Sequence, residues 1–557
     1  MQRLLALSLL TLCSCSKLIG LDDFKYDVGA AGGSAGDGGS AASAGANAGA
    51  QNGGAGDAGG TSGAGGPAGM GGSAGMGGAP GGAAGAGGTD ATGGVSGTGG
   101  SSGMTGAGGT GGTGPTCDTT KDPRYEPCLV DEAYGIFVSG DGDDTTGDGT
   151  RAAPYGSINR GLDAAAIAGK NVYACRDRGD YFAPVNYRAE HSGVSAYGLF
   201  ECDTWKVTGV ISLSNVSPPG VEPALTMNGL TGTTIVSGFA FWSHNATLPG
   251  QSSIAGLIEN SAGITLRDVT FDAGTGASGG AATLSPFDFP DGNLLKGNDA
   301  DSSGPGPSLS YTACPGGGTT VGGAGGSTNP SSGETGSPAL GGGQGGDVAE
   351  QSCDPGLGSG SKGANGLDGS AGAGAAIVGK LVGNQWVPQA GEAGEPGGIA
   401  QGGGGGRGSA TGAGGGGAPG GCGGAGGAAG LGGGASIGLL ALDSTVSVLD
   451  FTIRTHNAGD GGSGSLGQAG MLGGSAGAGW QAPAGCPGGD GGRGGAGGPG
   501  GAGAGGVVIG IAWRGNEPIR GTGGLTMGFA GKAGSAVGNG NPGVAGYFAF
   551  FKELPSN

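Results

Sequence analysis

The sequence predicts an all-β protein, in which short strands stack as a β-solenoid and long glycine-rich low-complexity segments interrupt the stack. Glycine accounts for 153 of the 557 residues, several times its usual share of roughly 7%. Long runs of good helix formers are almost missing, which excludes a helical bundle, a doubly wound fold and an α/β barrel. A β-rich motif recurs at 234–241, 264–271 and 446–453.

The three copies of this motif align without gaps. Apolar residues share the third, sixth and eighth positions, and the fifth is Gly238, Asp268 or Asp450. Alternation on either side of that break turns one apolar face inward. One coil cannot bury such a face alone, so neighbouring coils must complete it. Related strand starts lie at 253–258, 436–440 and 508–512.

The segment after Cys117 predicts a cap on this stack. A strand at 134–138 leads into an Asp/Gly loop at 140–150, and Ser157 is placed to N-cap a short helix that ends at Gly169. One helix face would carry Ile158, Leu162, Ala166 and Ile167. Strands are expected next at 172–175 and 194–200.

This order of elements, with Phe137-Val138-Ser139-Gly140-Asp141 and Pro154-Tyr155-Gly156-Ser157-Ile158, resembles a known family. It is similar to the opening of right-handed parallel β-helix proteins of the pectate-lyase-like superfold. The resemblance covers 117–274 and implies a right-handed parallel β-helix. It implies little about activity, because that superfold hosts many functions.

The glycine-rich tracts have a period of three. Residues 487–499 follow Gly-Gly-X, whereas strict Gly-X-Y appears in patches such as 391–397. Three alternatives stay open: disordered insertion loops, which we favour, packed polyglycine-II-like helices, and a collagen-like assembly. The 28 prolines are few for collagen. By composition the tracts resemble glycine-rich surface proteins of the PGRS type.

The N-terminus predicts export. Arg3 precedes a short apolar run that ends in Leu12-Cys13-Ser14-Cys15, which resembles a bacterial lipobox. The resemblance implies a lipoprotein that is acylated at Cys15 and held at the cell envelope, at the outer membrane or cell surface. The Gly/Ala/Ser-rich stretch that follows cannot offset the entropy of folding and is expected to be a flexible tether.

These observations divide the chain into eight parts. They are a signal peptide (1–14), an anchored N-terminus (15–27), a tether (28–116), a capped β-helix domain (117–274), a glycine-rich insertion (275–435), a β-helix coil (436–459), a second insertion (460–506) and C-terminal β coils (507–557).

Charge and cysteine content restrict the partners. The formal charge of −19 and the sparse basic residues exclude nucleic acid. The membrane anchor and extracellular or envelope polysaccharide remain as partners. Eight cysteines follow the export signal and predict disulfides. Short loop closure favours Cys117–Cys128, Cys175–Cys202, Cys314–Cys353 and Cys422–Cys486, although many other pairings are possible.

Two groups of residues are weak candidates for binding. The carboxylates of the 140–150 loop have ligand types that suit Ca²⁺, but the loop lacks EF-hand spacing, and a structural turn is the favoured alternative. Aromatic side chains could line a sugar-binding face or fill the core. The residues concerned are Asp141, Asp143, Asp144 and Asp148 for the metal, and Tyr197, Trp205 and Trp242 for the sugar.

We assign no catalytic residue and no cofactor apart from the weak Ca²⁺ candidate. Asp268, Asp272 and Asp450 lie in strands, but no two share a coil at a catalytic spacing. A repeated His-Asn pair, at His244 and His456, predicts a structural corner. The expected function is a non-catalytic, structural or adhesive cell-surface protein that binds polysaccharide. The alternative is an extracellular polysaccharide lyase or glycoside hydrolase.

Overall fold

The computed structural model describes residues 117–209 and 212–555. The predicted signal peptide (1–14), Cys15, the anchored segment (15–27) and the tether (28–116) lie outside the described residues. Strands make up 25% of the structure and helices 5%. The all-β prediction is therefore confirmed.

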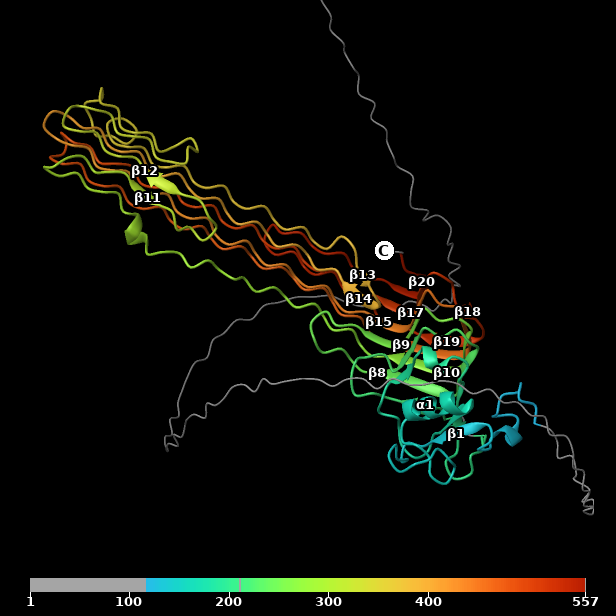
Figure 1. The fold of residues 1–557 in the computed structure, drawn as a ribbon. Coiled ribbons are helices and arrows are strands. Elements are labelled where there is room, and N and C mark those ends of the chain that lie inside the picture. Colours follow the sequence, from blue (N-terminus) through green and yellow to red (C-terminus); the bar gives the residue numbers. More distant parts are fainter. Residues whose placement is uncertain (1–116, 210–211, 556–557) are drawn as a thin grey trace, which may run out of the picture. The chain divides into compact units, whose positions relative to one another are not determined.

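Two parallel sheets dominate the described part of the chain (Figure 1). We call the ten-stranded one sheet A and the six-stranded one sheet B. Sheet A contains β1 (Gly135–Val138), β2 (Asn171–Cys175), β4 (Ala196–Phe200), β5 (Ser214–Val216), β7 (Thr234–Ser237), β8 (Phe239–Ser243), β10 (Ile264–Ala273), β16 (Val446–Thr455), β18 (Ile519–Arg520) and β19 (Gly523–Thr526). Sheet B contains β3 (Val185–Tyr187), β6 (Leu225–Asn228), β9 (Ser253–Glu259), β15 (Ser436–Leu442), β17 (Val508–Arg514) and β20 (Phe548–Glu553).

The predicted repeat alignment is confirmed residue by residue. Ile264 of β10 pairs with Thr234 of β7 on one side and with Val446 of β16 on the other. The break between strand halves is also where it was expected. Gly238, Asp268 and Asp450 all have positive φ, at 84°, 48° and 51°, a left-handed conformation that Gly and Asp tolerate better than branched residues.

The main core lies between the two sheets. Inward side chains of successive strands form ladders, in which Phe241 stacks on Phe271 with ring centroids 5.3 Å apart. Leu266 and Val448 are fully buried in the same cluster, together with Ile511 from sheet B. Burial of these ladders supplies the driving force that one strand pair alone could not.

One end of this core is covered by α1 (Ile158–Ala168), which contacts β1, β2 and β3. The Ser157 side chain accepts the N–H of Arg160, and Gly169 ends the helix with φ 62°, as predicted. The helix buries Ile158, Leu162 and Ala165. The expectation that Ile167 lies on or near the buried face is wrong, because its side chain is 89% exposed.

The glycine-rich tracts are ordered, so the expectation of disordered insertion loops is wrong. Extended segments lie side by side from the two sheets to the far end of the tracts, where β11 and β12 lie (Figure 1). Backbone hydrogen bonds join neighbouring segments at every third residue. This arrangement is the polyglycine-II-like alternative. The tracts also hold hairpins β11–β12 (Leu309–Tyr311, Thr320–Gly322) and β13–β14 (Gly379–Val382, Gln385–Pro388), while short 3₁₀ turns occur at η1 (Pro127–Leu129), η2 (Ala189–His191) and η3 (Gly292–Leu295).

Segment 486–506 has glycine-rich neighbours on several sides, which explains its Gly-Gly-X pattern. Within one triplet, Gly494 donates its N–H to Met471 O at 2.8 Å and Gly495 donates to Gly398 O at 2.9 Å. The third residue of this triplet, Ala496, donates to no backbone carbonyl, although its own carbonyl accepts the Gly369 N–H at 2.8 Å. Arg493 and Ala496 donate to the side chains of Asn365 and Asp368, and Pro499 has no N–H to donate.

Side-chain space follows the same rule. A Cβ on Gly494 would overlap Cys422 O, and a Cβ on Gly495 would overlap Leu367 O. Both glycines are therefore required by close approach of backbone. Segment 360–375 has fewer such neighbours and follows Gly-X-Y, in which it is glycines such as Gly363 and Gly366 whose added Cβ would overlap neighbouring backbone. The number of glycines in each triplet thus increases with the number of neighbouring backbone segments that pack against it.

All eight cysteines of the described chain form disulfides, which confirms the disulfide prediction. The expected pairs Cys117–Cys128 and Cys175–Cys202 are present. The expected pairs Cys314–Cys353 and Cys422–Cys486 are wrong. The bonds are Cys314–Cys422 and Cys353–Cys486, because folding of the tracts brings distant segments closer together than sequence neighbours.

Replacing Gly495 by Ala should destabilise the bundle by about 1–3 kcal/mol, the usual cost of overpacking. The added methyl group would overlap the Leu367 carbonyl oxygen. The matched control is Ala496→Ser, whose position already holds a Cβ, and it should change stability by less than about 0.5 kcal/mol. Denaturant unfolding of both variants checks the prediction, and equal midpoints would contradict it.

Non-reducing peptide mapping should recover one fragment that links Cys314 to Cys422 and another that links Cys353 to Cys486. These bonds close loops of more than 100 residues, so removing either should cost about 2–5 kcal/mol. Mass spectrometry of a proteolytic digest identifies the linked peptides. A Cys314–Cys353 fragment would show that the tracts pack differently.

Candidate functional site

On the outer face of sheet A, Asp272, one of the carboxylates considered for catalysis, lies beside Trp242, Arg454 and His456. Trp242 of β8 pairs with Asp272 of β10, and Asp272 pairs with Arg454 of β16. Asp272 is only 5% exposed, and its Oδ1 lies 3.0 Å from Nε2 of His456. Arg454 Nη1 is farther away, 3.9 Å from Oδ2.

A second charged cluster lies where the segment before η1 meets sheet A. Arg124, whose side chain is 1% exposed, contacts Asp122 at 2.6 Å and Asp268 at 2.9 Å. Burial lowers the pKa of Arg124, but the two carboxylates outweigh burial and raise it. Arg267 adds a longer contact to Asp122, at 3.8 Å. The cluster therefore holds the N-terminal segment on the sheet.

Each of the strand-borne carboxylates has its own partner. Asp268 binds Arg124, Asp272 binds His456, and Asp450 accepts the hydroxyl of Thr522 at 2.6 Å. Acid–base cleavage of a glycosidic bond usually needs two carboxyl groups on either side of that bond. Asp122 and Asp268 do come together on sheet A, but both are bonded to the same Arg124 Nη2, at 2.6 and 2.9 Å.

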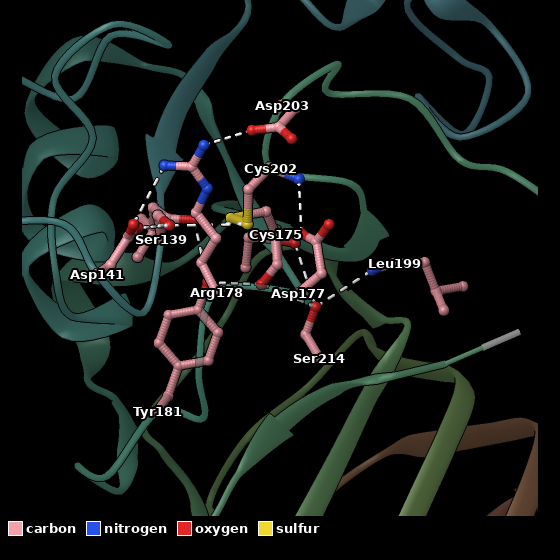
Figure 2. Close-up of a disulfide and its surroundings, with 12 residues drawn as sticks. Ser139, Asp141, Cys175, Asp177, Arg178, Tyr181, Leu199, Cys202, Asp203 and Ser214 are labelled. Carbon is pink, nitrogen blue, oxygen red and sulfur yellow. Dashed lines mark hydrogen bonds and ion pairs between the residues drawn. A yellow bond between two sulfur atoms is a disulfide. The ribbon is translucent and has the colours of Figure 1, made fainter. Parts of the chain in front are cut away.

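The carboxylates of the acidic loop bond mainly within the loop and its flanks. Asp141 accepts the Ser139 hydroxyl at 2.5 Å and contacts Arg178 at 3.1 Å (Figure 2). Asp143 accepts the N–H groups of Thr145 and Thr146, Asp144 accepts those of Gly156 and Ser157, and Asp148 accepts that of Thr150.

These hydrogen bonds favour the charged carboxylates. The bond from Ser139, supported by Arg178, holds the pKa of Asp141 below its usual value. Backbone N–H groups of Thr146 and Thr145 lower the pKa of Asp143. In the described chain, the one group of three potential ligands within 4.8 Å is Cys175, Asp177 and Cys202, and its sulfurs form a disulfide. The geometry therefore favours a structural turn, and the Ca²⁺ candidate stays a prediction.

The aromatic candidates separate into two environments. Tyr197 and Trp205 are each 5% exposed and belong to a buried cluster with Phe137, Tyr173 and Phe200. Burial also raises the pKa of the Tyr197 hydroxyl. Trp242 is 37% exposed on sheet A. Of the three, Trp242 is the one available to a ligand.

The repeated His-Asn pair forms the predicted structural corner, in which each asparagine side chain bonds to the backbone of a distant segment. Asn245 Oδ1 accepts the N–H of Thr275 at 2.8 Å, and Asn457 Oδ1 accepts that of Phe529 at 2.9 Å. Each asparagine therefore bonds a residue from the next strand-to-tract corner along the chain, not its own backbone. His456 contacts Asp272, while His244 lies 3.4 Å from the Ser217 hydroxyl.

A groove on the outer face of sheet B was missed from the sequence. Hairpin β13–β14 lies over this sheet, where Leu381 and Trp386 pack in one buried cluster with Ile437 and Ile509. Between the hairpin, β6 and β9 is a cavity of about 590 Å³, within the range of roughly 300–1,000 Å³ typical of ligand sites. Of its lining residues, Glu222 alone is ionisable.

The sequence held a signal for this hairpin. Residues 379–388, Gly-Lys-Leu-Val-Gly-Asn-Gln-Trp-Val-Pro, place Gly383-Asn384 between two β-rich runs inside a glycine-rich tract. Gly-Asn is a known two-residue hairpin turn. The surface on which the hairpin packs could not be read from this motif.

No protein-family model matches this chain, and no similar curated protein or solved structure was found. The described strands form two separate parallel sheets, which do not close on each other through backbone pairing. The resemblance to pectate-lyase-like β-helix lipoproteins with PGRS-type insertions is therefore wrong as a family assignment. None of the described helices has the length and apolarity needed to cross a membrane.

Replacing Arg124 by Met should lower the free energy of unfolding by about 3–5 kcal/mol, because it leaves Asp122 and Asp268 without their buried cation. The control is Arg188→Met, which also removes a cation from two carboxylates but at a side chain that is 56% exposed. That change should cost less than about 1 kcal/mol. Urea unfolding distinguishes them, and similar losses would argue against a buried ion cluster.

Proposed function

We propose that this protein is a non-catalytic structural or adhesive scaffold that binds polysaccharide. The observation that carries the proposal is the groove on sheet B, which is lined by carboxamides, hydroxyls and a tryptophan with a single ionisable residue. Uncharged hydrogen-bonding groups beside an aromatic ring suit a polyhydroxylated ligand.

The glycine-rich bundle supports the structural part of the proposal. Its segments are joined laterally by backbone hydrogen bonds, and two disulfides bind its loops to segments 412–434 and 486–506. Such a bundle can extend a binding surface without a large apolar core. The stack of sheets provides the platform from which it projects.

We further propose that the two parallel sheets belong to an open solenoid. The chain alternates between the two sheets, and matched registers link successive strands. This pattern supports an open solenoid, in which each turn adds a strand to each sheet. Membership of a known family forms no part of the proposal.

Location is proposed from the sequence. The apolar N-terminal run and the Leu-Cys-Ser-Cys motif support export and attachment to the cell envelope through lipidated Cys15. The oxidised cysteines of the described chain agree with an extracytoplasmic site. A surface position would give the groove access to envelope or extracellular polysaccharide.

The alternative function is a polysaccharide lyase or glycoside hydrolase. One observation favours it: Asp272 is nearly buried, lies 3.0 Å from His456 and is next to the partly exposed Trp242. A carboxylate that orients a histidine is a common part of acid–base sites. The proposal of a non-catalytic scaffold ranks first, because Asp268, Asp272 and Asp450 are each already bonded to a different protein group.

Incubating the full-length protein with immobilised polysaccharides should give retention without released oligosaccharide, both with Ca²⁺ and with a chelator. Retained protein and soluble reducing ends are measured together. Product that disappears in the Asp272→Asn variant would replace the scaffold by the enzyme. If the protein shows no retention and releases no product on either neutral or acidic polymers, polysaccharide binding is contradicted.

A further inference from the structure

The groove under hairpin β13–β14 contains a buried hydrogen-bond donor that the described chain does not satisfy. Trp386 lines the groove and is only 7% exposed. Its Nε1 has no hydrogen-bond partner among the residues of the structure. A buried indole N–H normally has one. Because this nitrogen is itself buried, a ligand in the groove can supply the acceptor only where the hairpin gives way to it.

Neighbouring carboxamides are already oriented by the protein. Gln251 Oε1 accepts the N–H groups of Thr247 and Leu248 at 3.2 Å each, which directs its NH₂ group away from these contacts. Asn384 donates its Nδ2 to Glu259 at 3.1 Å, which leaves its carbonyl oxygen as an acceptor. The groove therefore offers both a fixed donor and a fixed acceptor beside Trp386.

The charge of the groove restricts what it can bind. Glu222 is the ionisable residue of the lining, and the chain carries a formal charge of −19. A ligand with carboxylate or sulfate groups would be repelled by both. A carboxylate can instead accept hydrogen bonds from hydroxyl groups. Ile254 and Leu257 of β9 add an aliphatic wall.

We propose that the groove binds a neutral glycan chain, with a sugar oxygen accepting the Trp386 indole N–H and a sugar hydroxyl donating to Glu222. The inference rests on the polysaccharide binding proposed above and adds the class of polymer and the residues that recognise it. Acidic polysaccharides are excluded by the charge of the groove.

The test uses the full-length protein and compares neutral probes, dextran, laminarin and galactan, with polygalacturonate and alginate by calorimetry. We expect binding of at least one neutral polymer and none of the acidic ones. Trp386→Phe keeps an aromatic ring but removes the N–H, and should weaken binding roughly tenfold or more, as expected for an unmade hydrogen bond to a buried group. Trp480→Phe, outside the groove lining, is the matched control and should leave affinity unchanged, while Trp242→Phe tests the alternative position on sheet A.

A second variant protects the test against a folding defect in Trp386→Phe. Gln251→Glu keeps the oxygen that accepts the Thr247 and Leu248 N–H groups but replaces the NH₂ donor by a negative oxygen, so it should also weaken neutral-glycan binding. Unfolding midpoints identify any variant that is misfolded.

The outcomes separate this inference from the proposed function. Unchanged affinity in both groove variants, or preference for acidic polymers, would overturn the groove assignment while polysaccharide binding stands. Failure of the wild-type protein to bind any polymer would overturn both. Loss of affinity in Trp242→Phe, with the groove variants unaffected, would move the site to sheet A.

Discussion

The backbone hydrogen bond between neighbouring extended chains is the interaction on which both halves of this structure depend. In the sheets it joins parallel strands, and their apolar ladders then bury against one another. In the glycine-rich tracts it joins segments such as 486–506 and 389–404 at every third residue. There, close approach of backbones replaces the side-chain core, and it is possible because a Cβ is missing where a carbonyl must pass.

This difference in packing explains how the groove is positioned. Hairpin β13–β14 emerges between bundle segments 360–375 and 389–408, and its Leu381 and Trp386 enter the apolar cluster on the outer face of sheet B. The bundle therefore determines where the hairpin can lie, and the cluster holds it against β9, β15 and β17. The groove forms at the boundary, where the hairpin leaves β6 and part of β9 uncovered. Its buried indole donor belongs to the same tryptophan that holds the hairpin in place.

Local patterns were sufficient to predict the repeats. The position of Gly238, Asp268 and Asp450 between strand halves followed from alternation and turn chemistry, and the registers agree with it. The order of the bundle was harder to predict, because the period of three is compatible with a disordered chain and with a packed one. What decides is whether enough neighbouring segments are present, and that is a property of the whole fold. The cross-paired Cys314–Cys422 and Cys353–Cys486 bonds depend on the same long-range packing, as does the groove.

The two long-range disulfides also address the main thermodynamic weakness of a glycine-rich fold. Glycine loses more backbone freedom on folding than any other residue, and each hydrogen bond contributes only about 0.5–1.5 kcal/mol net. The sequence separations within these disulfides are 108 and 133 residues. A loop near 100 residues removes about 4–5 kcal/mol of unfolded-state entropy in the chain-entropy model. The cross-links therefore lower the conformational entropy of the unfolded chain, which is large because of its many glycines. Since sequence-neighbour pairing would have closed shorter loops, the pairing found in the bundle is also the one that restricts the unfolded chain more.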